Sequence, residues 1–276
     1  MDLSDIKNLK LALKLSGLEA KKSYGQNFLV DKDALNAIVA SADLVQTDTV
    51  LEIGPGLGVL TDELVQYAGR VVAVEADAEL AELLERRATA NLSVIATDAL
   101  QYDLGQLPRG YKVVANLPYY ITSLLLRFLL EANNKPTSIT VLVQKEVAER
   151  IIAKPGQMSV LACSVQYYGK ASLVRVVPAA SFYPSPKVDS AILHIDIDAQ
   201  PAFEADTKQL FRLIKAGFGE KRKMLRNALA GGLAVSTGQA EQMIATAGLK
   251  ETVRAQELSL DQWEHLYRAY SDSYKT

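Results

Sequence analysis

The segment Thr49-Val-Leu-Glu-Ile-Gly-Pro-Gly-Leu-Gly58 decides the fold of this 276-residue chain. An apolar, β-branched run ends in closely spaced glycines, and a helical pattern follows at once from Leu60 to Tyr67. Glycines permit a tight turn there and bring a ligand close to the backbone, beside the free N–H groups of a helix N-terminus. We therefore predict a strand, a binding turn and a helix, which together open a parallel α/β sheet.

Outward from this segment, short apolar runs alternate with helical patterns. The predicted strands are Thr49 to Ile53, Arg70 to Glu75, Leu92 to Ala96, Lys112 to Ala115, Ser138 to Val143, Ser172 to Val177 and Val188 to Ile197. Strands that are apolar on both faces and separated by helices form parallel sheets covered on each side. No helix separates the last two runs, so we expect them to pair antiparallel. The pattern predicts an α/β fold with a doubly wound, mostly parallel seven-stranded sheet.

The β pattern stops after residue 197. Asp198 to Pro201 is predicted to be a linker, and residues 202–276 are predicted to be entirely helical, with helix stops at Gly231-Gly232 and at Gly248. We therefore predict two domains, residues 1–200 carrying the binding site and residues 201–276 forming a small all-helical C-terminal domain.

Composition excludes several classes of protein. With 30 Lys and Arg against 32 Asp and Glu, the net charge of −2 does not draw the whole chain towards nucleic acid or membrane, so a polyanion would be met locally. One cysteine, Cys163, and two histidines, His194 and His265, exclude a disulfide scaffold and a structural zinc site. The first 22 residues lack a long apolar run. We expect a cytoplasmic protein with no metal and no membrane partner.

Two further strand ends carry carboxylates. Glu75 follows Gly54 by 21 residues, where a carboxylate can bind two ribose hydroxyls. The spacing of Gly54, Gly56 and Gly58 lacks the third glycine of the dinucleotide fingerprint, which favours S-adenosylmethionine over a nicotinamide cofactor. Asp98 ends the third strand and has two interpretations, a ligand contact at the same sheet edge or a helix N-cap.

The fourth strand ends in Asn116-Leu117-Pro118-Tyr119, the most specific signal in the chain. An exocyclic adenine amine is a poor nucleophile, because its lone pair is delocalised into the ring. The side-chain oxygen of Asn116 and the carbonyl of Leu117 can accept its two N–H bonds and favour a more tetrahedral nitrogen. Pro118 restricts φ, and Tyr119 can stack on the base. The motif predicts N6 methylation of adenine without a metal or a strong general base.

Three other segments suit a nucleic-acid substrate. The loop Phe182-Tyr-Pro-Ser-Pro-Lys187 can form the far wall of a pocket for an extruded base, with Phe182 facing Tyr119, although such a loop alone is more often a packing hairpin. Two basic clusters are predicted RNA contacts rather than solvated faces. They are Lys7, Lys10, Lys14, Lys21 and Lys22 near the N-terminus, and Lys221, Arg222, Lys223 and Arg226 in the helical region. The basic face of residues 208–226 is predicted to contact phosphates, which would make residues 201–276 an RNA-binding domain.

In these motifs the chain resembles the ribosomal RNA adenine N6-dimethyltransferases, which have a Rossmann-like S-adenosylmethionine-dependent methyltransferase fold. The resemblance covers residues 21–229 and includes Gly25-Gln-Asn-Phe-Leu29, Glu52 to Gly58, Asn116 to Ile121, Gln144 to Arg150, Phe182 to Ser190 and Phe218 to Leu229. It implies that Asn27 and Leu29 close over the cofactor, that Gly54, Glu75 and Asp98 bind it, and that Asn116 bridges cofactor and target amine.

The resemblance is strongest to the branch of this family that acts on the small ribosomal subunit. It implies dimethylation of two adjacent adenosines in the 3′-terminal hairpin of 16S ribosomal RNA within a pre-30S particle, by a monomer. Three alternatives stay open at this point. They are a large-subunit adenine methyltransferase, against which the run Lys221 to Asn227 argues, a non-catalytic ribosome assembly factor, and a nicotinamide-dependent oxidoreductase.

Overall fold

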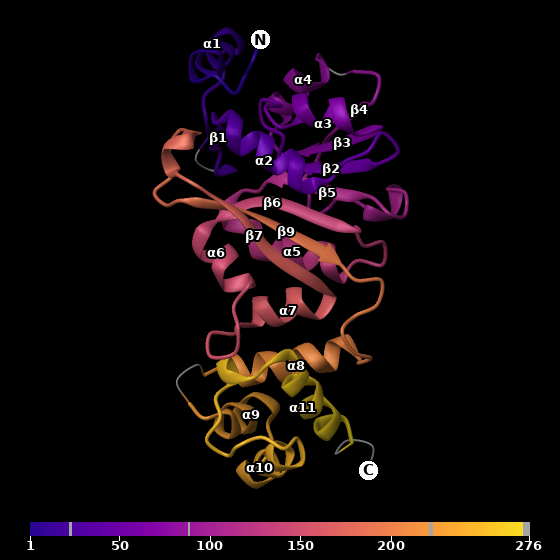
Figure 1. Ribbon diagram of the computed structural model, residues 1–276, viewed down its shortest axis with the longest axis vertical. Helices are drawn as coiled ribbons and strands as arrows, with labels where there is room; N and C mark the ends of the chain where they lie inside the picture. Colours follow the sequence, from indigo (N-terminus) through magenta and orange to yellow (C-terminus); the bar gives the residue numbers. More distant parts are fainter. Residues whose placement is uncertain (22–23, 88, 221–222, 273–276) are drawn as a thin grey trace. The chain divides into compact units, whose positions relative to one another are not determined.

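A computed structural model of the chain describes residues 1–21, 24–87, 89–220 and 223–272 (Figure 1). Its contacts divide it into two compact units. The first, here called the sheet unit, comprises Met1–Ala148 and Ala171–Ile197, and the second, the helical unit, comprises Glu149–Lys170 and Asp198–Thr276. None of the helices within the described ranges has the length and apolar character that crossing a membrane would require.

A seven-stranded sheet forms the centre of the first unit. Its strands are β2 (Thr49–Ile53), β3 (Arg70–Glu75), β4 (Leu92–Ala96), β5 (Lys112–Asn116), β6 (Ser138–Gln144), β7 (Gly169–Val177) and β9 (Ser190–Ile197). They lie in the order β4-β3-β2-β5-β6-β9-β7. The first five are parallel to their neighbours, and β9 is antiparallel to β6. The predicted sheet with a mixed edge is confirmed.

Helices follow most of the strands, as the alternating pattern predicts. They are α2 (Lys32–Ala42), α3 (Thr61–Tyr67), α4 (Ala78–Glu85), α5 (Thr122–Glu131) and α6 (Lys145–Ile151). Helix α2 contacts β5, β6 and β9, while α4 contacts β3 and β4. Each helix buries an apolar stripe and leaves polar residues outside, which is the arrangement that a doubly wound sheet needs.

A second, two-stranded sheet joins segments that are far apart in the sequence. Strand β1 (Phe28–Leu29) pairs antiparallel with β8 (Phe182–Tyr183), so that Leu29 faces Phe182 in register. The Asp31 carboxylate accepts a bond of 2.6 Å from the Ser181 hydroxyl beside this pair. The sheet and helix α1 (Ile6–Ser16) share one apolar core cluster. This pairing links the Gly25–Leu29 motif to the Phe182 loop.

The helical unit contains α7 (Val160–Tyr168), α8 (Thr207–Phe218), α9 (Leu225–Leu233), α10 (Thr237–Thr246) and α11 (Leu260–Asp272). Tyr167 packs edge-on against Phe203 and Phe211, and the buried Trp263 stacks on Phe218. The contact boundary therefore differs from the boundary predicted at residue 200, because it assigns Glu149–Lys170 to the helical unit. The aromatic contacts of α7 give the physical reason.

One predicted helix stop is wrong. Gly231 and Gly232 lie inside α9, which ends at Leu233 before Ala234 in the left-handed region. A side chain at Gly232 would place Cβ 2.7 Å from the Ala216 backbone, so this glycine permits α8 and α9 to pack closely. The predicted stop at Gly248, with φ of +69°, is confirmed, since α10 ends at Thr246.

Candidate functional site

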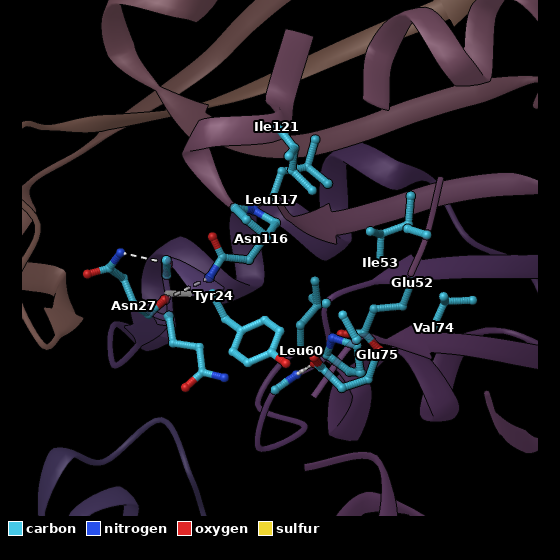
Figure 2. Close-up of a pocket in the computed structure, with 18 of the residues that line it drawn as sticks. Tyr24, Asn27, Glu52, Ile53, Leu60, Val74, Glu75, Asn116, Leu117 and Ile121 are labelled. Atoms are coloured by element: carbon cyan, nitrogen blue, oxygen red, sulfur yellow. Dashed lines mark hydrogen bonds between the residues drawn. The ribbon is translucent and has the colours of Figure 1, made fainter. Parts of the chain in front are cut away.

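A pocket opens in the sheet unit where the carboxyl ends of β2, β3, β4 and β5 meet (Figure 2). Open α/β sheets bind ligands at this edge. Most of the residues predicted for cofactor binding and chemistry line it, namely Asn27, Leu29, Gly54, Gly56, Glu75, Asp98, Asn116, Leu117, Pro118 and Tyr119. Residues from five separate segments thus form one site.

The glycine turn after β2 forms the floor of this pocket. Gly54 and Gly56 have φ of +68° and +59°, a region that residues with a side chain rarely adopt. A Cβ at Gly56 would also lie 2.9 Å from the Phe28 ring. Gly58 is not among the residues that line the pocket. A Cβ there would lie 2.7 Å from Leu84, so this glycine lets the turn pack against α4. Its predicted contact with the cofactor stays a prediction.

Glu75 holds the turn in place. Its side chain is 6% exposed, and its two carboxylate oxygens accept bonds of 2.9 Å from the backbone N–H groups of Gly56 and Asp77. Burial raises the pKa of Glu75, and the two backbone donors partly oppose that shift. Because each oxygen has two lone pairs, both can still accept a hydroxyl of a bound ligand.

The neighbouring Glu52 lines the pocket, which sequence reasoning missed. Its carboxyl group is 1% exposed, lines the pocket, and accepts a 2.6 Å bond from the Thr61 hydroxyl. Burial, with the charge of Glu75 adding to it, raises the pKa of Glu52 to about 8. The available signal was one acidic residue inside the otherwise apolar strand Thr49–Ile53.

Asn116 ends β5 with an oriented amide. Its Nδ2 group donates a 3.0 Å bond to the carbonyl of Asn27, and the Nδ2 group of Asn27 donates to the carbonyl of Gly25 (Figure 2). This bond uses one of the two N–H donors of Nδ2 and orients the amide, so Oδ1 and the second N–H of Asn116 remain for a ligand. The contact also fastens the Gly25–Leu29 motif to the strand end that carries the predicted chemistry.

Tyr119, three residues after Asn116, is also held in place by a hydrogen bond. The Tyr119 hydroxyl shares a 2.6 Å hydrogen bond with the hydroxyl of Ser190, which is buried at the start of β9. Burial raises the pKa of Tyr119, and the hydrogen bond from Ser190 partly opposes that shift. Pro118 continues the turn, and its carbonyl accepts bonds from Ile121 and from the Thr122 hydroxyl. A stiff turn therefore presents the Tyr119 ring at the pocket.

The Gly25–Leu29 motif, which the resemblance predicts to cover the cofactor, is held at its N-terminal side by charged side chains. Lys21 contacts Asp77 at 2.9 Å and Glu79 at 2.5 Å, and the Gln26 amide donates a 3.1 Å bond to Asp77. Between these anchors the Tyr24 ring extends into the pocket (Figure 2). Asp98 is exposed, and its Oδ1 accepts from the N–H of Leu100, so it closes a turn as well as lining the pocket.

Comparison with known proteins identifies the family of a chain with this site. The model of the ribosomal RNA adenine dimethylase family matches residues 17–272. The chain belongs to the ribosomal RNA adenine dimethylase family. Among similar proteins, a ribosomal RNA small subunit methyltransferase A of Dehalococcoides mccartyi is 48% identical over 262 residues, which cover 92% of this chain and 89% of that protein.

Further proteins are similar to this chain in sequence or in structure. The small subunit methyltransferase A of Desulfitobacterium hafniense is 41% identical and covers 92% of this chain and 93% of its own length. A solved dimethyladenosine transferase from Plasmodium falciparum shares the fold, with a TM-score of 0.76 over 89% of this chain and 98% of its own, at 24% identity. The 23S rRNA methyltransferase ErmE has a TM-score of 0.71 at 27% identity, covering 89% and 100%.

Two groups of residues predicted for this dimethylase do not lie at the pocket. Phe182 is 3% exposed within the core cluster and is not among the pocket residues. Of the predicted RNA contacts, Lys22, Lys221 and Arg222 lie outside the described residues. Lys223 and Arg226 belong to the helical unit, where they pair with Glu220 at 2.5 Å and Glu241 at 3.1 Å.

Proposed function

We propose that this chain transfers methyl groups from S-adenosylmethionine to the N6 amines of two adjacent adenosines in the 3′-terminal hairpin of small-subunit ribosomal RNA. The observation that carries the proposal is the oriented amide of Asn116 beside the glycine turn and Glu75. The names of the relatives at 41–48% identity support the small subunit as the target. The proposal includes a late precursor of the subunit as substrate and a cytoplasmic location.

The pocket fits the cofactor in two respects. Its floor accepts no side chain at Gly56, as expected where a ligand lies against the backbone, and its buried carboxylate at Glu75 keeps acceptor capacity for ribose hydroxyls. In the proposal Gly54 and Gly56 contact the cofactor, Asp98 binds its base, and Asn27 and Leu29 cover it. When bound, S-adenosylmethionine would supply an electrophilic methyl carbon on a sulfonium.

The chain's own contribution to the reaction is to position and polarise the amine. Asn116 Oδ1 and the carbonyl of Leu117 each accept one N–H of the target amine, which shifts its nitrogen towards a tetrahedral geometry and frees the lone pair. Tyr119 stacks on the extruded base and offsets part of the unstacking energy. Phe182 is buried in the core cluster, so it would stack on the base only after leaving that position.

A large-subunit target is the second candidate, because ErmE shares the fold at 27% identity. Backbone likeness alone does not distinguish the targets, since the Plasmodium falciparum dimethyladenosine transferase is also similar. The higher identity to small subunit methyltransferases favours the first candidate. A non-catalytic assembly factor would have no need of the oriented Asn116 amide.

One experiment separates these functions. Small subunits that lack the modification, and large subunits as a second substrate, are incubated with the protein and methyl-labelled cofactor, and the modified nucleotides are mapped by mass spectrometry. We expect N6,N6-dimethyladenosine at two adjacent positions of the small-subunit RNA. Label only in the large-subunit RNA would establish the alternative target. RNA binding without label from a cofactor-bound protein would establish the non-catalytic function.

A further inference from the structure

One large aromatic side chain at the pocket has no part in the proposed reaction. Tyr120 lies in the short 3₁₀ turn η3 (Tyr119–Ile121), lines the pocket and is 65% exposed. Its neighbour Tyr119 is bonded to Ser190, whereas no hydrogen bond or ion pair formed by the described residues involves the Tyr120 hydroxyl. The fold therefore leaves this ring open to solvent beside the site where a base would enter.

The ring of Tyr120 is supported on its protein side by the Gly25–Leu29 motif. A Cβ at Gly25 would lie 3.3 and 3.4 Å from two carbons of the Tyr120 ring, so the ring lies close against the backbone of this glycine. Gly25 has φ of +62°, a region that residues with a side chain rarely adopt. Because the ring touches backbone on one side and is still largely exposed, most of its surface is available to a ligand.

Two hydrogen bonds hold this support in a fixed relation to Asn116. The carbonyl of Gly25 accepts from the side chain of Asn27, and the carbonyl of Asn27 accepts from Nδ2 of Asn116. The amide that carries the proposed chemistry and the backbone beneath the Tyr120 ring are therefore held in one arrangement. A ring positioned in this way loses little conformational entropy when a ligand stacks on it.

We infer that Tyr120 stacks on the base next to the adenosine that enters the pocket, an inference that rests on the proposed function. Extruding one base from a stack exposes a face of its neighbour, which is costly. An aromatic side chain replaces the lost partner, because every base has a π-face that stacks on such a ring. Tyr119 and Tyr120 are consecutive, as are the two target adenosines, so one ring serves the base inside the pocket and the other serves the base at its mouth.

In this arrangement Tyr120 is a positioning residue, which holds one adenosine beside the pocket while the other reacts. Kinetics with unmodified small subunits and saturating S-adenosylmethionine provide the first test. Tyr120→Ala and Tyr120→Leu both lose the ring, and kcat/KM should fall roughly 5- to 100-fold, as expected for one lost base stack. Tyr120→Phe keeps the ring and should restore kcat/KM to within a few-fold of the parent. A Phe variant as slow as the Leu variant would overturn the proposal.

Two controls separate stacking from other losses. Tyr67→Ala removes a tyrosine that is 47% exposed at the end of α3 and outside the pocket, and it should match the parent. Cofactor affinity is measured by calorimetry in each Tyr120 variant, because the ring also touches the motif that is proposed to cover the cofactor. A loss of cofactor affinity as large as the loss of kcat/KM would assign the effect to that motif and overturn the proposal.

A fluorescent base reports the stacking directly. Small subunits are reconstituted on RNA in which 2-aminopurine, which lacks the reactive amine and is quenched by stacking, replaces one or the other of the two adjacent adenosines. At saturating protein, the parent and Tyr120→Phe should quench at least one of the two probes, and Tyr120→Leu should leave that probe bright. Equal emission with all three proteins would overturn the proposal.

Methylation by the parent protein distinguishes this inference from the proposed function. No methylation of the small subunits, together with quenching that depends on the Tyr120 ring, would refute the proposed function and leave the stacking established. Methylation of two adjacent adenosines, with kcat/KM and emission unaffected by loss of the ring, would refute the stacking and leave the proposed function intact.

Discussion

The pocket of the sheet unit and the contact of α8 with α9 in the helical unit are built in opposite ways. The pocket depends on buried polar contacts between residues far apart in sequence, such as Gly56 with Glu75 and Asn116 with Asn27. The helix contact depends on close packing at Gly232, where there is no room for a side chain. Buried polar contacts are sensitive to single atoms, because an unpaired buried group is costly, whereas close packing is sensitive to added volume. Single substitutions should therefore alter binding and catalysis in the first region and stability in the second.

The largest effect is expected at Asn116. Asn116→Ala removes an acceptor directed at the reacting amine, and the loss of one such group typically lowers the rate 100- to 1000-fold. Single-turnover methylation at saturating cofactor and RNA measures it, with cofactor affinity determined separately by calorimetry. A near-parental rate would refute the mechanism. Loss confined to RNA affinity would show that the motif only docks RNA.

Glu75 tests whether the same pocket binds the ribose. Glu75→Ala should weaken S-adenosylmethionine binding by about 1.5 to 3 kcal/mol, since a hydrogen bond to a charged group is lost. Glu85→Ala, which removes an exposed carboxylate from α4, is the control and should bind normally. Unchanged calorimetric affinity in a folded Glu75 variant would contradict the ribose assignment.

Tyr119 separates stacking from hydrogen bonding. Tyr119→Ala should slow methylation roughly 10- to 100-fold, because base stacking on an aromatic ring contributes about 1 to 3 kcal/mol. Tyr119→Phe keeps the ring and loses only the bond to Ser190, so its rate should stay within a few-fold of the parent. If both variants were equally slow, positioning by Ser190 and not stacking would explain the residue.

Two adjacent glycines test the close packing of α8 on α9. Gly232→Ala should lower the free energy of unfolding by about 1 to 3 kcal/mol, because its Cβ would meet Ala216. Gly231→Ala has open space and should stabilise α9 by roughly 0.5 to 1 kcal/mol. Urea unfolding of both variants decides, and equal shifts in one direction would contradict the packing of α8 on α9.

A further prediction concerns Glu52 and pH. Its folded pKa of about 8 lies above the ordinary 4.5, so the folded state holds a proton that the unfolded state has released between these values. Stability should therefore fall as pH rises from 4.5 to 8 and level off above it. Glu52→Gln should be more stable than the parent at pH 9, by about 1 kcal/mol or more, and similar at pH 5. A constant difference across this range, as expected for the exposed Glu82→Gln, would contradict the shift.

Sequence patterns alone determined the strands, their parallel arrangement and the pocket at their carboxyl ends. Local features suffice for this, because apolar runs, glycine turns and the polar residues after them depend on near neighbours in the chain. Gly54, Glu75 and Asn116 follow consecutive or neighbouring strands, and parallel topology brings such positions to one edge.

Only the tertiary structure decided the remaining features, because each depends on which distant residue fills or pairs with a site. Phe182 is buried since β8 pairs with β1, a contact between two-residue strands that carry no periodic signal. Gly231 and Gly232 lie inside a helix although glycines usually end helices, and Gly232 is required there because α8 packs against α9 at this position. Arg226, predicted from a run of basic residues to contact RNA, pairs with Glu241, which the packing of α9 against α10 brings to it.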